Sequence, residues 1–445
     1  MIASSLEIKP ILHPLNATVR VPGSKSLTNR ALLIASLANG TTHLTNALFS
    51  DDSRYFVKAL QTLGFDIQLD ETNHEMTVTG LGGQIPAQNA ELFIGNAGTA
   101  ARFLSAFLTL GHGEYILDGE PRMRERPIGD LVESLTQLGA KLETVNNCPP
   151  VKIFASGLPG GKTKIAGNIS SQFLSALLMV APYAQSPIEI ELTTDLNSKP
   201  YVDMTIATMR DFGVDVQRDE YKSFSIPISN YQLPNLNHQS PISNSLIPTY
   251  AIESDASAAS YFFAAPVICG GTVRVENISR KSKQGDIAFL DILKQMGCIV
   301  TDSENFIEVT STTELHGIDV DMRDIPDTAQ TLATVAPFAS SPTRIRGIAS
   351  ARVKETDRVS ATRNELKRLG VQVEEHNDGM TIYPCKTFKP TNVQTYNDHR
   401  MAMAFSLIGL RFDGVTIENP GCVSKTFPNY FEVLETLRAT DSNVS

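Results

Sequence analysis

The sequence does not have the residue patterns that are typical of zinc-binding or nucleic-acid-binding proteins. Its five cysteines, at positions 148, 269, 298, 385 and 422, lie far apart, without a CxxC pair or a zinc-like Cys/His spacing. The net charge is −10 and no run of lysines or arginines occurs, which argues against a nucleic-acid-binding surface. We therefore expect reduced structural thiols, no metal site and no nucleic-acid partner.

Apolar runs long enough to cross a membrane are also missing. The longest, such as Ala402 to Leu410, fall well short of the roughly 20 residues that a membrane helix needs. Residues 1–10 contain neither the pattern of a secretory signal nor the Arg- and Ser-rich character of a transit peptide. We expect a cytoplasmic protein that does not use a membrane.

An internal repeat organises the 445 residues. Six segments with a polar start run into an apolar helix about every 73 residues, and they begin at Ser26, Thr99, Ser171, Ser257, Thr328 and Arg400. Five amphipathic helices end in step with them, at Gly64, Gly139, Gly213, Gly297 and Gly370. Because two independent markers share one period, we predict six copies of an αβ unit.

The one longer interval lies between the third and fourth copies. Its extra residues fall in Ile226 to Thr249, whose Asn, Pro and Ser content is typical of a linker. The sixth copy has a last helix, Tyr430 to Leu437, but no strand after it, whereas Leu6 to Val21 has strand character and no helix before it. We predict two domains of three repeats, 24–252 and 1–23 plus 253–445, so that the chain crosses between them twice.

The polar starts of these helices suggest anion binding. A helix that is apolar on most faces, such as 173–180, belongs inside its domain. If the helix N-termini converge at the gap between the domains, their N–H groups and dipoles favour anions there. Simple helix capping is the alternative, but it does not explain why Arg or Lys accompanies four of the six starts.

Several short segments have the residue types that bind phosphate or move protons. Lys25, Ser26 and Arg30 form a candidate phosphate site, although the upstream glycine of a Walker motif is absent. The segment 95–99 offers backbone for close approach, and 122–127 holds three arginines suited to a carboxylate or phosphate. Asp327, beside an apolar helix start, is either a base or a cap.

Two denser segments lie in the second half, Lys354 to Arg358 and Asn397 to Arg400. Both mix acids, bases and arginine, as general acid/base work on an anionic substrate requires. Together, eight segments in order resemble the 5-enolpyruvylshikimate-3-phosphate synthase family: PGSKSLTNRA, GNAGTAARF, GEPRMRERPIGDL, NISSQFLSALL, SKPYVDMT, RVKETDR, YNDHRMAMA and SKTFPNYF. The resemblance covers nearly the whole chain.

The resemblance implies an α/β (α+β) fold, a two-domain inside-out α/β barrel of six βαβαββ units, three in each domain. It implies transfer of the enolpyruvyl group of phosphoenolpyruvate to the 5-hydroxyl of shikimate-3-phosphate, by a monomer without a cofactor. The resemblance assigns shikimate-3-phosphate to Lys25, Ser26, Arg30, Ser170, Ser171, Gln172, Ser198, Tyr201, Asp327, Ser350 and Lys354. It assigns phosphoenolpyruvate to Lys25, Asn96, Gly98, Arg126, Gln172, Arg358, Arg400 and Lys425.

The catalytic residues follow from the same resemblance. Asp327 is the expected base for the hydroxyl, Glu355 with Lys25 or Lys425 is expected to move the proton at C3, and His399 completes the catalytic set. Two positions depart from the family pattern. Ser350 stands where many relatives have asparagine, and Phe103 where many have proline, which is expected to weaken inhibition by glyphosate.

Three rival functions follow from related patterns. The sister enzyme that acts on UDP-N-acetylglucosamine usually has a reactive cysteine on its arginine loop, and Arg122 to Arg126 has none. The second rival, an RNA-terminal phosphate cyclase, needs a nucleotide-accepting histidine and a basic surface, and the net charge of −10 argues against it. A binding protein without activity would not need Asp327, Glu355 and Lys425 together.

Overall fold

The computed structural model describes residues 4–234 and 247–438. Half of the linker predicted at 226–249, namely residues 235–246, therefore lies outside the described residues. The chain divides into two compact units. The continuous unit is Gly23–Glu253, and the discontinuous unit joins Met1–Pro22 to Ser254–Ser445. Within the described ranges, no helix has the length and apolar character to cross a membrane.

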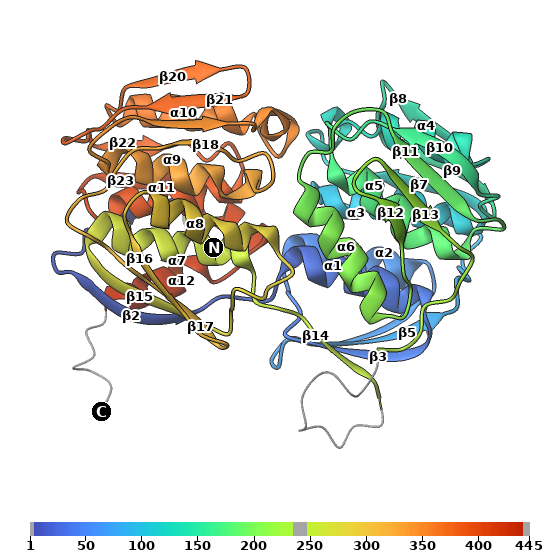
Figure 1. The fold of residues 1–445 in the computed structure, drawn as a ribbon. Helices are drawn as coiled ribbons and strands as arrows, with labels where there is room; N and C mark the ends of the chain where they lie inside the picture. The colour runs from blue at the N-terminus through green and yellow to red at the C-terminus, as the bar shows by residue number, and fades with distance from the viewer. Residues whose placement is uncertain (1–3, 235–246, 439–445) are drawn as a thin grey trace. The chain divides into compact units, whose positions relative to one another are not determined.

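Three four-stranded sheets form the continuous unit (Figure 1). Each has one parallel strand pair, and its remaining pairs are antiparallel. In order across each sheet the strands are β14 (Thr249–Ala251), β3 (Asn39–Thr45), β5 (Glu75–Leu81) and β4 (Asp66–Asp70); β6 (Asn89–Phe93), β7 (His112–Asp118), β9 (Cys148–Ser156) and β8 (Lys141–Val145); β10 (Gly161–Ile165), β11 (Ile188–Leu192), β13 (Ser223–Ile226) and β12 (Gln217–Asp219).

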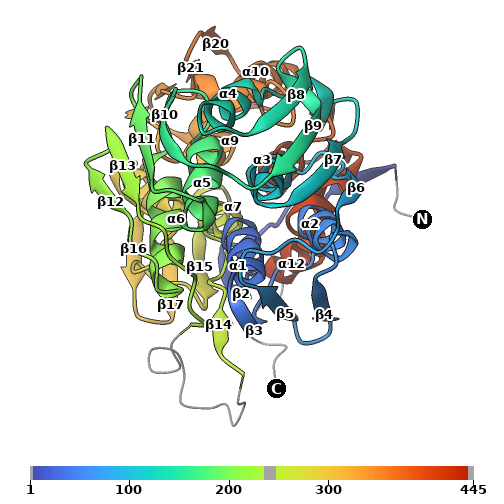
Figure 2. The same cartoon turned by 90° about the vertical axis from the view of Figure 1, so that its right-hand side faces the viewer.

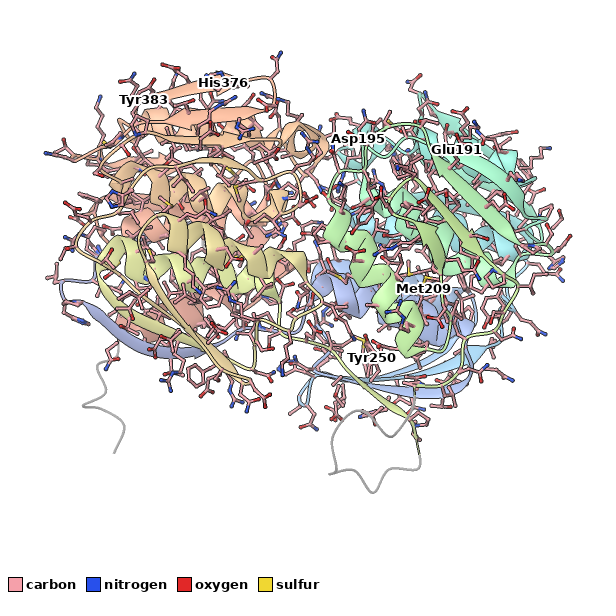
Figure 3. All side chains as sticks on the ribbon, viewed as in Figure 1. Glu191, Asp195, Met209, Tyr250, His376 and Tyr383 are labelled. Atoms are coloured by element: carbon pink, nitrogen blue, oxygen red, sulfur yellow. The ribbon has the colours of Figure 1, made fainter. Side chains whose placement is uncertain are left out.

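In the described part of this unit, six α-helices accompany the sheets, and Figure 2 shows strands at the periphery of the unit. They are α1 (Lys25–Leu37), α2 (Asp51–Thr62), α3 (Gly98–Phe107), α4 (Gly129–Gln137), α5 (Ser171–Val180) and α6 (Lys199–Asp211). Every residue of α3 is buried, and every residue of α5 except Gln172, as their apolar sequences predict. Exposed positions of β10 and β11 carry charged side chains: Lys164 pairs at 3.0 Å with Glu191, which Figure 3 labels.

The discontinuous unit repeats the same strand pattern. Two of its sheets have four strands and the third has three. Their strands, in order, are β16 (Ile299–Asp302), β17 (Phe306–Thr310), β15 (Gly271–Glu276) and β2 (Leu15–Arg20); β18 (Asp319–Asp321), β19 (Thr343–Arg346), β21 (Gly379–Ile382) and β20 (Val373–His376); β1 (Ser5–Ile8), β23 (Val415–Glu418) and β22 (Thr391–Val393). Tyr383, after β21, donates from its hydroxyl to Glu374 at the surface (Figure 3).

The discontinuous unit, like the continuous one, has α-helices between its strands. They are α7 (Ala256–Cys269), α8 (Phe289–Gln295), α9 (Ala329–Val335), α10 (Arg358–Arg368), α11 (His399–Gly409) and α12 (Tyr430–Glu435). The predicted terminal glycines follow α8 and α10 with positive φ, +108° at Gly297 and +93° at Gly370. Left-handed backbone suits glycine, which explains why these helices end there.

Two strands are exchanged in chain order: each belongs to one unit, while the helix that follows it in sequence belongs to the other. β2 comes just before α1 in sequence, yet it pairs in parallel with β15 of the discontinuous unit. β14 comes just before α7, yet it pairs in parallel with β3 of the continuous unit. At the other end, β1 pairs with β23 and supplies the strand that the sixth copy does not have after its last helix. The mixed α/β class is as predicted.

Candidate active site

The N-terminus of α1 presents two of the predicted phosphate-binding residues. Ser24 caps the helix by accepting from the Leu27 N–H at 3.5 Å, so Lys25 and Ser26 occupy the first turn. Lys25 Nζ lies 3.6 Å from Asp52 Oδ2 of α2. First-turn N–H groups and a lysine both favour an anion, so this turn can bind a phosphate group.

Arg30, one turn further along α1, is only 2% exposed. Its guanidinium donates to Thr205 Oγ1 at 2.7 Å, to Ser26 O at 2.9 Å, to Tyr201 O at 3.1 Å and to Ser175 Oγ at 3.4 Å. Burial lowers the pKa of Arg30 to about 10. Arg30 thus links α1, α5 and α6 in this structure, and its contact with a substrate phosphate stays a prediction.

Gly98 and Arg126 lie together at the start of α3, where an anion site is predicted. Arg126 Nη1 donates to both oxygens of Asn96, each at 3.1 Å. A Cβ atom added to Gly98 would lie 2.4 Å from Arg126 Nη2, so only glycine lets the guanidinium lie against this helix start. Arg126 is buried and planar, and its fork suits a carboxylate or a phosphate.

The three arginines of segment 122–127 do not act together. Arg122 pairs with Glu125 at 2.8 Å, and Arg124 pairs with Asp118. Both are on the surface, whereas Arg126 turns inward to Asn96. The interpretation of this segment as one three-arginine cluster is therefore wrong, because neighbouring acids bind two of its members.

The start of α5 carries three more of the predicted residues. Ser170 caps the helix by accepting from the Gln172 N–H at 3.3 Å, and Ser171 is buried in the first turn. Gln172 Nε2 donates to Thr99 Oγ1 at 3.4 Å, which joins the first turns of α5 and α3. The structure thus brings these polar groups together at adjacent helix starts.

Ser198 and Tyr201 stand at the start of α6. Ser198 precedes the helix with φ +58°, in the left-handed region that residues other than glycine seldom adopt. Such backbone persists only where its surroundings fix it, and it is concentrated at functional sites. Tyr201, in the first turn of α6, accepts from Arg30 through its carbonyl oxygen, so Arg30 holds this turn against α1.

In the discontinuous unit, Asp327 lies between two arginines. It stands in a 3₁₀ turn, Pro326–Thr328, just before α9. Arg358 Nη1 donates to Asp327 Oδ1 at 3.0 Å, and Arg400 Nη2 donates to Oδ2 at 2.7 Å. The alternative that Asp327 is only a helix cap is not needed, since both of its oxygens serve arginines from α10 and α11. Two cations favour the ionised carboxylate, which is the form that accepts a proton.

Glu355 connects the same arginine to a lysine. Glu355 Oε2 accepts from Arg358 Nη2 at 2.7 Å, and Oε1 lies 3.8 Å from Lys425 Nζ. Lys354 Nζ lies 4.0 Å from Asp327 Oδ1. Ser350, half-buried in the 3₁₀ helix Ala349–Val353, is on the segment that leads to these residues. One largely buried cluster therefore holds the carboxylates of Asp327 and Glu355 together with several cations.

Asp398 was not among the predicted site residues. It caps α11 by accepting from the Arg400 N–H at 2.9 Å, and it accepts from Arg358 Nε at 2.8 Å. Burial opposes the charge of Arg358, but Asp398, Glu355 and Asp327 raise its pKa above the ordinary value. The dense segment 397–400 is the sequence signal that could have identified Asp398.

His399 follows Asp398 and is fully buried in α11. Its Nδ1 lies 3.5 Å from Asp398 Oδ1. A side chain so enclosed is placed to support Asp398, and a direct catalytic role for His399 stays a prediction.

A second missed carboxyl, Asp286, lies in the same unit and is 4% exposed. It stands in a 3₁₀ turn, Gly285–Ala288, and accepts a short hydrogen bond from the Ser257 hydroxyl. Burial, together with the charge of Asp327, raises the pKa of Asp286 to about 6, while Ser257 and Arg400 oppose the rise. No local motif distinguishes Asp286, because its neighbours come from distant segments.

None of the described cysteines supplies a charged group to the site. Burial raises the pKa of the Cys422 thiol to about 12, so it is a poor nucleophile near neutral pH. Among the described residues, no group of three or more His, Cys, Asp or Glu side chains is arranged to hold a metal ion. The charged groups of the site are protein arginines, lysines and carboxylates.

The sequence and the fold match proteins of a known family along almost the whole chain. The family model for EPSP synthase (3-phosphoshikimate 1-carboxyvinyltransferase) matches residues 11–434. A 3-phosphoshikimate 1-carboxyvinyltransferase from Trichormus variabilis is 49% identical over 430 residues, which cover 96% of this chain and 97% of the relative. One from Sulfurovum sp. is 49% identical over 438 residues, 98% and 99% of the two chains. The structure of an EPSP synthase from Acinetobacter baumannii superposes with a TM-score of 0.80 at 25% identity, covering 97% of this chain and 98% of that one.

Proposed function

The chain belongs to the EPSP synthase family, and from this premise we propose that it transfers the enolpyruvyl group of phosphoenolpyruvate to the 5-hydroxyl of shikimate-3-phosphate. Phosphate is the second product, and the reaction lies on the shikimate route to aromatic amino acids. The observation that carries the proposal is the buried cluster in which Arg358 and Arg400 hold the two oxygens of Asp327. Such a cluster suits proton transfer on a substrate with several negative charges.

We assign shikimate-3-phosphate mainly to the continuous unit. First-turn groups at three helix starts support this assignment, because N–H groups and hydroxyls there favour a phosphate. The assigned residues are Lys25, Ser26, Arg30, Ser170, Ser171, Gln172, Ser198 and Tyr201, with Asp327, Ser350 and Lys354 from the discontinuous unit.

We assign phosphoenolpyruvate to cations from both units. The planar forks of Arg126, Arg358 and Arg400 suit its carboxylate and phosphate, which a guanidinium binds through two parallel hydrogen bonds. The assigned residues are Lys25, Asn96, Gly98, Arg126, Gln172, Arg358, Arg400 and Lys425.

The reaction proceeds by addition and elimination. The 5-hydroxyl oxygen attacks C2 of phosphoenolpyruvate and gives its proton to Asp327, while C3 gains a proton from Glu355 or from Lys25 or Lys425. In the tetrahedral intermediate, the bond between C2 and the phosphate oxygen then breaks, C3 gives its proton back to the group that supplied it, and the proton held by Asp327 leaves with the phosphate. Arg358 and Arg400, which bind Asp327, stabilise the negative charge that accumulates during the addition. This electrostatic stabilisation is largest where water is excluded. His399 supports Asp398 in this scheme.

Further properties are proposed on the same family basis. Each unit is proposed to be three βαβαββ copies of an inside-out α/β barrel, and the exchange of β2 and β14 supports this arrangement. The enzyme is proposed to be a cytoplasmic monomer that uses neither a cofactor nor nucleic acid. Gly98 and Thr99 match the form that glyphosate blocks, and Phe103, buried in α3, is proposed to modulate that inhibition.

Phosphate release from phosphoenolpyruvate tests the function. The assay is run with shikimate-3-phosphate or with UDP-N-acetylglucosamine as the acceptor, each with a chelator present. We expect release with shikimate-3-phosphate alone and no effect of the chelator. Release only with the nucleotide sugar, or with neither acceptor, would contradict the proposal.

A further inference from the structure

Glu365 is a fully buried carboxylate that binds the segment leading into the acid–base cluster. It lies on α10 with 0% exposure. Its Oε2 accepts from the Gln394 backbone N–H at 3.0 Å and from Arg368 Nη1 at 2.5 Å. Its Oε1 accepts from the Tyr396 hydroxyl at 2.9 Å. Two of these three donors belong to the segment before Asp398.

That segment has an unusual backbone. Tyr396 has φ +53° and Asn397 has φ +54°, so two successive residues other than glycine adopt the left-handed region. Residues other than glycine seldom adopt this conformation, and it persists only where the surrounding structure enforces it. Besides the bonds from Glu365, Asn419 Nδ2 donates to Asn397 Oδ1 at 3.1 Å. The strained pair fixes the direction in which Asp398 and α11 begin.

Helix α10 therefore holds this segment at two points. Arg358, its first residue, donates to Asp398 at 2.8 Å and 3.3 Å. Glu365, two turns later, binds the residues just before Asp398. Since Asp398 in turn caps α11 at Arg400, both guanidinium groups that hold Asp327 depend on where this segment lies.

We propose that Glu365 is a positioning residue for catalysis, which sets the placement of Arg358 and Arg400 through the Gln394–Tyr396 segment and Asp398. The proposal rests on the proposed function, because it needs those arginines to bind phosphoenolpyruvate. An ion pair with Arg368 alone does not account for the three interactions of the buried Glu365 carboxylate. Arg368 is the residue's neighbour on the same helix, and its exposed side chain contributes little. The same carboxylate also accepts from the Gln394 backbone N–H and from the Tyr396 hydroxyl, and these two part-buried bonds reach the segment before Asp398.

Steady-state kinetics of three variants test the proposal. Glu365→Ala removes all three acceptor interactions, so we expect the KM for phosphoenolpyruvate to rise at least about tenfold and kcat to fall. Glu365→Gln keeps acceptor geometry for Gln394 and a partner for Tyr396, so we expect it to restore both constants to within about threefold. Tyr396→Phe removes one bond and should raise this KM about threefold.

Tyr430→Phe is the matched structural control. Its hydroxyl bonds to Ser406 and to the Met403 carbonyl, and it is buried against the same helix α11. This variant should lower the melting temperature without changing KM or kcat. If Glu365→Ala folds and keeps wild-type constants, or if Tyr430→Phe changes KM equally at an equal loss of melting temperature, the proposal is wrong.

The remaining outcomes are also decisive. If Glu365→Ala does not fold, Tyr396→Phe decides, because an unchanged KM in that variant overturns the proposal. A wild-type protein that releases no phosphate with shikimate-3-phosphate contradicts the proposed function instead. An active wild type with unaffected variants contradicts only the role of Glu365.

Discussion

In the continuous unit the buried arginines donate to neutral oxygens, whereas in the discontinuous unit they donate to carboxylates. Arg30 bonds hydroxyls and backbone carbonyls, and Arg126 bonds the two oxygens of Asn96. Arg358, by contrast, contacts the carboxylates of Asp327, Glu355 and Asp398. The same residue type therefore serves two different tasks.

This difference indicates a division of labour. A guanidinium that donates to neutral groups keeps its positive charge for an incoming anion, as a phosphate site requires. Arginines bound to carboxylates have part of their charge balanced. Besides the phosphoenolpyruvate binding proposed for them, Arg358 and Arg400 hold the Asp327 carboxylate in place for proton transfer. We infer that the continuous unit mainly binds substrate and that the discontinuous unit mainly supplies acid–base chemistry.

The largest effect is expected from Asp327→Asn, which removes the base and keeps the shape. Turnover should fall about 10²- to 10⁴-fold, since general-base catalysis contributes an effect of that size. Steady-state phosphate release with both substrates at saturation measures it. A variant with more than a tenth of wild-type turnover would show that Asp327 is not the base.

Paired arginine substitutions compare the units by stability. Arg358→Met leaves buried carboxylates without their main cation, so we expect a loss of about 3–5 kcal/mol. Arg30→Met should cost less, about 1–2 kcal/mol, because the Thr205 hydroxyl still donates to Ser175 at 2.8 Å and other neutral bonds remain. Urea unfolding at pH 7 measures both variants. Equal losses would contradict the contrast between the units.

Asp286→Asn should make stability less dependent on pH. The folded pKa of Asp286, raised to about 6, lies above its unfolded value, so the native state binds more protons between about pH 4 and 6. Its contribution to stability is present below that window and is lost as the pH rises through 6. A pKa difference of about 2 corresponds to about 3 kcal/mol.

The variant should therefore gain stability relative to the wild type between pH 4 and pH 7. Urea unfolding at several pH values checks this. A constant difference between the two proteins across that range would show that Asp286 does not titrate there.

Gly98→Ala tests the anion site of the continuous unit with the smallest change. The new methyl group would lie 2.4 Å from Arg126 Nη2 and must displace the guanidinium. We expect the KM for phosphoenolpyruvate to rise about tenfold, equivalent to about 1.4 kcal/mol. The KM for shikimate-3-phosphate is the internal control and should change less than about threefold. An unchanged KM for phosphoenolpyruvate would show that Arg126 does not bind that substrate.

The repeat and its helix starts could be predicted from sequence because both depend on local signals. Polar residues before an apolar run mark an N-terminus, and the glycine after α2, Gly64, adopts φ +97° as a helix end requires. The two crossings of the chain were predicted from the copy that has no final strand, but the strand partners of β2 and β14 were not, because they depend on pairing between distant segments. The expected strand character of Leu6 to Val21 is present as two separate strands, β1 and β2.

The site was predictable only where a motif carries it. Glu355 and Lys425 lie in the family motifs RVKETDR and SKTFPNYF, whereas Asp327 was assigned by the overall resemblance. The structure places Asp327 against Arg358 and Arg400, and Glu355 between Arg358 and Lys425. Asp286 and Glu365 could not be found in this way, because their roles arise from partners on other helices and loops. Sequence proximity also misled at Arg122 and Arg124, since their acidic partners Glu125 and Asp118 decide which way they turn.

Titration calorimetry of shikimate-3-phosphate with the wild type and with Asp327→Asn tests the division of labour most directly. If the continuous unit mainly binds and the discontinuous unit mainly catalyses, the variant should bind shikimate-3-phosphate within about tenfold of the wild-type Kd while its turnover falls at least about 100-fold. If binding weakens by the same factor as turnover, Asp327 acts mainly in substrate binding and the division is wrong.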